Sequence, residues 1–157
     1  DASNFHNNAQ GTGFVGMLNP GGLNDDEVLL WVPDGSDLTT TTTTNIPSQV
    51  ASRLALILRV SDADTAGDPV DIGDVDVRFD LSGFGSVDPS IVWLLVDTDG
   101  DGSFSDESPI TTITSIGGDV YAFEQISALT NNSRFTLGFG KQKIITNRKI
   151  TYRIHKG

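Results

Sequence analysis

Residues 74–81 read Asp-Val-Asp-Val-Arg-Phe-Asp-Leu, and this stretch gives the clearest structural signal in the chain. Charged and apolar side chains alternate at every position, which is the period of a β-strand with one face in a core and one face in water. Further apolar segments at 53–60, 91–96 and 134–139 have the length and composition of strands. The sequence therefore predicts an all-β fold.

The candidate strands follow one another at the spacing of a β-sandwich. We expect about eight or nine of them, in an antiparallel sandwich that is immunoglobulin-like or jelly-roll-like. A chain of 157 residues fits one such domain. The predicted parts are an extended N-terminal segment at residues 1–26, the sandwich domain at 27–140, and a basic C-terminal strand or tail at 141–157.

The net charge of the chain is −11, and it is unevenly distributed. All 21 acidic residues but only four basic ones precede residue 141, so that this part carries −17, whereas residues 141–157 carry +6. Binding to a nucleic-acid backbone needs a basic surface, so we expect no nucleic-acid partner for the protein as a whole. The longest apolar run, 91–96, is far shorter than the ~20 residues of a membrane helix, so we also expect no membrane insertion.

The basic C-terminal segment has the period of a half-buried strand. Its apolar residues Ile150, Tyr152 and Ile154 occupy alternate positions, with polar or basic residues between them. We therefore interpret 141–157 as an assembly strand that pairs with an acidic sheet, either of its own body or of another subunit. A nucleic-acid or membrane tail and a purification remnant are the simpler alternatives.

The loop at residues 97–108 has the composition of a calcium site. Asp97, Asp99 and Asp101 occupy its first, third and fifth positions, and two glycines allow the backbone to turn sharply between them. Three carboxylates so close together repel one another unless a cation lies between them. The sequence therefore predicts bound calcium, and the simpler alternative is a solvated turn without an ion.

The sequence is less clear about the other ligands of this loop. In the helix–loop–helix calcium hand the twelfth residue is a glutamate that binds the ion through both oxygens, whereas this chain has Ser108 there. Asp106 or Glu107 would then complete the site, with Ser103 as a further ligand. Because a strand precedes the loop and no helix is expected after it, we predict a site that stiffens a hairpin and does not switch.

A second acidic stretch lies between residues 61 and 80. Asp62, Asp64 and Asp68 could supply oxygen ligands to a second ion. Their spacing is looser than in the loop at 97–108, and the later acids of the stretch fit better on the solvent face of a strand. A second metal site stays an alternative.

The sequence offers no clear catalytic group. A Ser/His pair or a His-based metal site needs a placed histidine, and His6 and His155 lie at opposite ends of the chain. The acidic residues are numerous, and no pair stands out for glycoside hydrolysis. We therefore predict that the protein is not an enzyme. Trp31 and Trp93 could stack on a sugar, although both lie in apolar strands that are more typical of a core.

Four motifs in this order resemble a module that recurs in large surface and secreted proteins of Bacteroidetes. They are FDLSG at 79–83, WLLVDTDGDG at 93–102, FTLG at 135–138 and ITNRKITYR at 145–153. The resemblance implies an adhesin-like, extracellular protein without enzymatic activity, exported by the type IX system. It also implies a glycosylation site at Thr65, because such bacteria attach sugars at sequences of the form Asp64-Thr65-Ala66.

Taken together, these observations predict a structural or adhesive protein of the bacterial surface that is stabilised by calcium. We expect it to assemble through terminal strands into a filament or tandem array, with other copies of itself or neighbouring modules as partners. The alternative is a glycan-binding module of a larger secreted protein, with surface glycans as partners.

Overall fold

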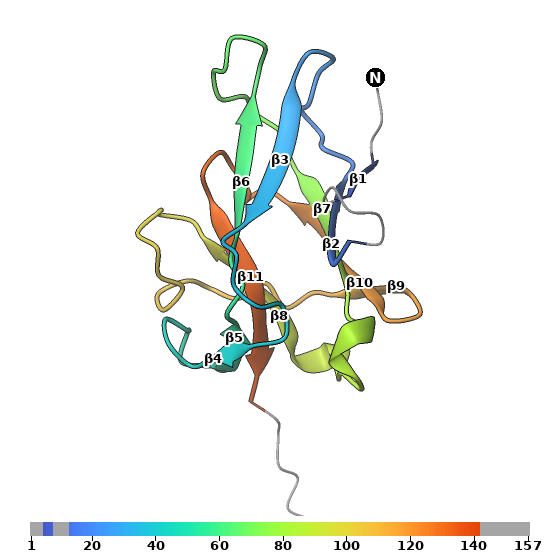
Figure 1. Cartoon of the computed structure of the whole chain (residues 1–157), viewed down its shortest axis with the longest axis vertical. Helices are drawn as coiled ribbons and strands as arrows, with labels where there is room; N and C mark the ends of the chain where they lie inside the picture. The colour runs from blue at the N-terminus through green and yellow to red at the C-terminus, as the bar shows by residue number, and fades with distance from the viewer. Residues whose placement is uncertain (1–4, 8–12, 142–157) are drawn as a thin grey trace, which may run out of the picture.

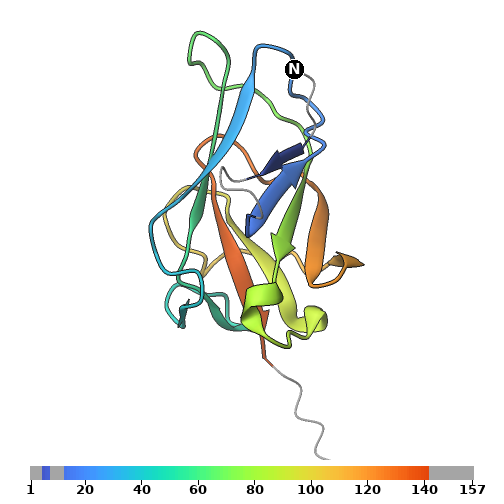
Figure 2. The same ribbon diagram turned by 45° about the vertical axis from the view of Figure 1, so that its right-hand side comes forward.

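The structure is a computed structural model that describes residues 5–7 and 13–141. These residues form eleven β-strands in two antiparallel sheets that lie face to face (Figure 1, Figure 2). The predicted all-β sandwich is confirmed, with more strands than the eight or nine expected. Across the described ranges, no helix has the length and apolar character needed to cross a membrane.

The first sheet contains five strands in the order β1, β2, β7, β10, β9. Their bounds are Phe5–Asn7 for β1, Val15–Leu18 for β2, Val75–Asp80 for β7, Thr114–Gly117 for β9 and Val120–Ile126 for β10. The second sheet contains six strands. Their bounds are Val28–Pro33 for β3, Thr41–Thr42 for β4, Val50–Leu54 for β5, Leu58–Ala63 for β6, Val92–Asp97 for β8 and Arg134–Gly140 for β11.

Strand β11 lies in the middle of the second sheet and is paired along both edges. One edge pairs with β8 from Arg134, opposite Asp97, to Phe139, opposite Val92. The other edge pairs first with β6 and then with β5. β5 and β6 therefore form one interrupted strand, where the sequence predicted a continuous strand at 53–60. The interruption falls beside Thr136, whose buried hydroxyl donates to the carbonyl of Leu56 at 2.6 Å.

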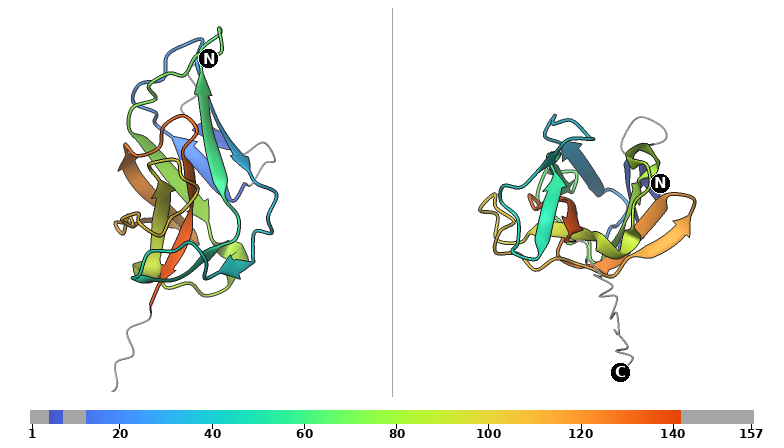
Figure 3. Two further views of the ribbon diagram at one scale, coloured as in Figure 1. Left: turned by 90° about the vertical axis from the view of Figure 1, so that its left-hand side faces the viewer. Right: turned by 90° about the horizontal axis from the view of Figure 1, so that it is seen from below.

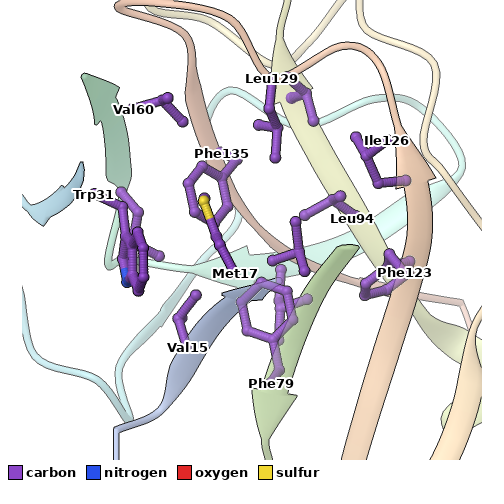
Figure 4. Close-up of a cluster of buried hydrophobic side chains, with 14 of the residues drawn as sticks. Val15, Met17, Trp31, Val60, Phe79, Leu94, Phe123, Ile126, Leu129 and Phe135 are labelled. Carbon is purple, nitrogen blue, oxygen red and sulfur yellow. The ribbon is translucent and has the colours of Figure 1, made fainter. Parts of the chain in front are cut away.

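The main core fills the space between the two sheets (Figure 3, Figure 4). Phe79 of β7 packs edge to face against Phe123 of β10 and Phe135 of β11, with ring centroids 6.0 and 6.4 Å apart. The alternation at 74–81 is confirmed, because its apolar residues are all buried in this core. They are Val75, Val77, Phe79 and Leu81.

A second, smaller apolar cluster lies on the outer face of the second sheet. Successive residues of a strand point to opposite faces, so Leu94 enters the main core while its neighbour Leu95 enters this second cluster. Val50 and Phe104 complete the buried part of the cluster. The guanidinium of Arg53 lies 5.3 Å from the ring centroid of Phe104, within the range of a cation–π contact.

The sandwich begins earlier than the predicted boundary at residue 27. The segment 1–26, which we expected to be extended and outside the sandwich, contributes β1 and β2 to the first sheet. Val15 and Met17 of β2 are fully buried. β2 has only four residues and includes a glycine, so its period is too short to stand out from the flanking Asn and Gly residues.

We predict that replacing Thr136 with valine lowers the free energy of unfolding by about 1–3 kcal/mol, because the buried carbonyl of Leu56 then loses its donor. Urea titration followed by tryptophan fluorescence measures this change. Thr112→Val, at an exposed position, is the matched control and should change stability by less than about 0.5 kcal/mol. Equal stability of the two variants would contradict the role given to the Thr136 hydroxyl.

Candidate metal centre

The loop at residues 97–108 leaves the end of β8 and folds back over the outer face of the second sheet. Phe104, near its middle, is 1% exposed because its ring fills the second cluster against Val50 and Leu95. The start of the loop is fixed by the pairing of Asp97 with Arg134 across β8 and β11. Asp99 and Asp101 lie between Asp97 and Phe104 and are thus held on a short segment that is fixed at both ends.

The carboxylate of Asp97 is buried and accepts three hydrogen bonds. Its Oδ1 accepts the backbone N–H of Gly100 at 2.7 Å, and its Oδ2 accepts the backbone N–H of Gly102 at 3.0 Å and Nη1 of Arg134 at 3.1 Å. Gly100 and Gly102 adopt φ values of 77° and 86°, which L side chains rarely adopt. The first half of the loop therefore wraps around the carboxylate of Asp97, which accepts hydrogen bonds from its backbone.

Asp99 and Asp101 lie on the same turn and are exposed. Oδ1 of Asp99 accepts the N–H of Asp101 at 3.2 Å, and Oδ1 of Asp101 accepts the N–H of Ser103 at 2.6 Å. One carboxylate oxygen from each of Asp97, Asp99 and Asp101 lies within 4.8 Å of the other two. These three aspartates could therefore hold a metal ion, and no other such group of acidic, His or Cys residues exists in the part of the chain that the structure describes.

The other predicted ligands of this loop take different positions. Glu107 turns towards Thr98 and accepts its backbone N–H at 2.5 Å and its hydroxyl at 2.9 Å. The hydroxyl of Ser103 pairs with that of Ser105 at 2.8 Å. Asp106 is exposed and does not join the three-aspartate group. Glu107 closes the loop through hydrogen bonds, whereas the sequence had suggested that Asp106 or Glu107 completes the site as a metal ligand.

Arg134 belongs to this site, although the sequence analysis did not identify it. Its ion pair with Asp97 joins residues from two strands, and the side chain of Arg134 remains 39% exposed. Its positive charge offsets part of the repulsion among the three carboxylates. Only the β8–β11 register brings the two residues together, and no spacing along the sequence signals it.

The three aspartates of the possible second site do not form a metal-binding group. Asp62 is 2% exposed, and its Oδ1 accepts the N–H of Val70 at 3.0 Å. Burial raises the pKa of the Asp62 carboxyl above its ordinary value. Asp64 instead caps its own loop, since its Oδ1 accepts the N–H groups of Ala66 and Asp68, each at 2.9 Å.

The remaining candidate residues are placed as follows. Thr65 is exposed in the turn after β6, where a sugar could be attached. Trp31 is 8% exposed in the main core, and Trp93 packs against the second cluster. The ring of Trp31 is thus covered by the core, whereas Trp93 is partly exposed. The residues of the predicted assembly strand lie outside the described part of the chain; they are Ile150, Tyr152 and Ile154.

Asp97 has a structural role that does not depend on a metal, and this generates a prediction. In buffer containing a chelator, Asp97→Ala should lower the free energy of unfolding by about 2 kcal/mol, because the N–H groups of Gly100 and Gly102 lose their acceptor. Asp99→Ala, which removes one exposed contact, is the control and should cost less than about 1 kcal/mol. Chemical denaturation measures both values, and an equal loss in the two variants would contradict the role given to Asp97.

Comparison with known proteins identifies a family and no function. A family model described as a domain of unknown function (DUF8202) matches residues 6–134, which include the three aspartates and Arg134. No protein with a curated description and no solved structure matches the chain. The chain belongs to the DUF8202 family.

Proposed function

We propose that this chain is a non-enzymatic structural module of the bacterial surface, stabilised by calcium and joined to other copies or neighbouring modules through its basic C-terminal segment. The observation that carries the proposal is the convergence of Asp97, Asp99 and Asp101 on one anchored loop. Their carboxylates are held in position by the backbone of the loop itself. This arrangement suits a permanent structural ion.

Calcium suits these ligands better than other common ions. The group offers carboxylate oxygens and no nitrogen or sulfur, which favours a hard cation such as calcium or magnesium over zinc or copper. Calcium accepts irregular geometry and six to eight oxygens, whereas magnesium demands a near-ideal octahedron. A loop that supplies three side chains and leaves the other positions to water and backbone oxygens fits calcium.

The position of the loop indicates what bound calcium would do. The loop carries Phe104 into the second cluster and is linked to β11 through the Asp97–Arg134 ion pair. An ion held by the three aspartates would hold the loop against the sheet and would expose no new surface. Extracellular calcium modules bind at roughly 10⁻⁴–10⁻³ M, so such a site would be filled outside the cell.

The charge distribution supports assembly through the C-terminal segment. The part before residue 141 carries −17 and the segment 141–157 carries +6, so the segment of one copy is attracted to the body of another. Its alternating apolar residues suit pairing with a sheet edge. The resemblance of the sequence to modules of Bacteroidetes surface proteins favours the same location outside the cell.

We predict that calcium raises the melting temperature and that the effect depends on the three aspartates. At about ten times the dissociation constant, calcium adds about 1.4 kcal/mol of stability, or a few degrees for a domain of this size. Asp101→Asn should remove most of this gain. Asp106→Asn, a matched change outside the three-aspartate group, should keep it. Thermal unfolding of the three proteins, with calcium and with a chelator, measures this effect. If calcium does not raise the melting temperature of the wild type, the proposed calcium site is wrong.

We predict that deleting residues 141–157 leaves soluble monomers. Electron microscopy and size-exclusion chromatography of the full chain should show assemblies, because the deleted segment supplies the pairing strand. Adding a chelator to the full chain tests how far assembly depends on calcium. Assembly by the shortened chain, or a full chain that stays monomeric with calcium present, would contradict the proposed function.

A further inference from the structure

Edge strand β3 carries an exposed row of apolar side chains. Val28, Leu30 and Val32 are 49%, 55% and 56% exposed, and they make up three of the five large apolar residues that are exposed in the described part of the chain. Leu29 and Trp31, between them, point into the core. The outward face of β3 thus presents apolar residues at three alternate positions where polar residues would be expected.

No strand of the described part of the chain pairs with the outer edge of β3. β3 stands at the end of the strand order of the second sheet, and among the strands that the structure describes it pairs only with β6. An edge strand exposes a row of N–H and C=O groups that can accept a further strand. Natural edges are often protected by charged residues or proline; the three outward residues of β3 are uncharged, and its only proline, Pro33, is its last residue.

Acidic residues flank β3 at both ends and limit which strand can pair with it. Asp26 and Glu27 precede the strand, and Asp34 follows it. If two β3 strands paired antiparallel about Leu30, the acidic turn before one strand would come close to Asp34 at the end of the other. Like charges opposite each other destabilise a pair of strands, so β3 is a poor partner for itself.

The C-terminal segment has the complementary pattern. Residues 148–156 contain three apolar residues at alternate positions and basic residues at both ends. We infer that residues 148–156 of one copy add as an antiparallel strand to the free edge of β3 of the next copy, with Tyr152 opposite Leu30. This inference rests on the proposed function, and it names the strand that receives the assembly segment.

The register with Tyr152 opposite Leu30 matches the remaining residues in both chemistry and position. The apolar residues on either side also face each other, Ile150 with Val32 and Ile154 with Val28. Opposite charges meet at one end, Arg148 with Asp34, and at the other end Lys156 comes close to the acidic residues of the turn that precedes β3. Both kinds of cross-strand pair stabilise a sheet. The added strand would extend a sheet in which every existing pairing is antiparallel.

The decisive experiment uses two full-length variants that each lack one half of the contact. Leu30→Lys removes the receiving surface, and Tyr152→Lys removes the inserted strand. Each substitution should weaken association by on the order of tenfold to a hundredfold, as expected for the loss of one buried large side chain. Sedimentation velocity in calcium should show assemblies for the wild type and monomers for each variant alone. An equimolar mixture of the two variants should form dimers and nothing larger, because it contains only one working contact.

Four further variants control for folding and test the register. Ile116→Lys, at an exposed apolar residue on β9, is the matched control and should assemble like the wild type. Asp34→Lys and Arg148→Glu should each weaken association several-fold, and the double variant should recover it, because the opposite charges are exchanged. Melting temperatures equal to that of the wild type show that the variants are folded.

The outcomes separate this inference from the proposed function. If Leu30→Lys assembles like the wild type while deletion of 141–157 prevents assembly, β3 is not the receiving strand and the proposed function stands. If the mixture of Leu30→Lys and Tyr152→Lys stays monomeric while both are folded, the inference is also overturned. A wild type that never assembles contradicts the proposed function and this inference with it.

Discussion

The pairing of β11 along both of its edges is the constraint on which the rest of the structure depends. Alternate residues of β11 serve the two faces of the second sheet, so one strand organises both apolar clusters. Phe135 and Leu137 enter the main core, while Arg134 and Thr136 lie on the outer side and bind Asp97 and Leu56. The break between β5 and β6, the second cluster and the aspartate loop are all positioned by this alternation.

Two glycines of β11 allow the outer side of the sheet to pack closely. A Cβ atom at Gly140 would lie 2.6 Å from Cζ2 of Trp93, and one at Gly138 would lie 3.0 Å from Cδ1 of Leu95. The distance at Gly140 is shorter than real Cβ contacts and the distance at Gly138 is tighter than most of them, so Trp93 and Leu95 pack closely against bare backbone. Because Leu95 supports Phe104, these glycines determine how closely the loop at 97–108 approaches the sheet.

The sequence predicted those features that depend on local period and local composition. The alternation at 74–81 and the turn built on Asp97, Asp99 and Asp101 needed only neighbouring residues, and both are present in the structure. Contacts that depend on strand register could not be predicted. Arg134 reaches Asp97 only because β8 and β11 pair in one particular register, and Glu107 bonds to Thr98 only because Phe104 anchors the loop between them.

The same strand connects the candidate metal centre to the C-terminal segment. β11 begins at Arg134, which holds Asp97, and ends at Gly140, after which the chain continues into residues 141–157 (Figure 1). In the proposed assembly, tension on that segment enters the body at Gly140, and its component along β11 would act on both edges of that strand. Ladder hydrogen bonds run perpendicular to the strands, so the pairs with β8 on one edge and with β5 and β6 on the other are loaded together and in shear. An ion at the aspartate loop would strengthen the β8–β11 pair at the Arg134 end, opposite the end where the tension enters. A calcium site at this position would therefore suit a module that is joined through its terminal strand.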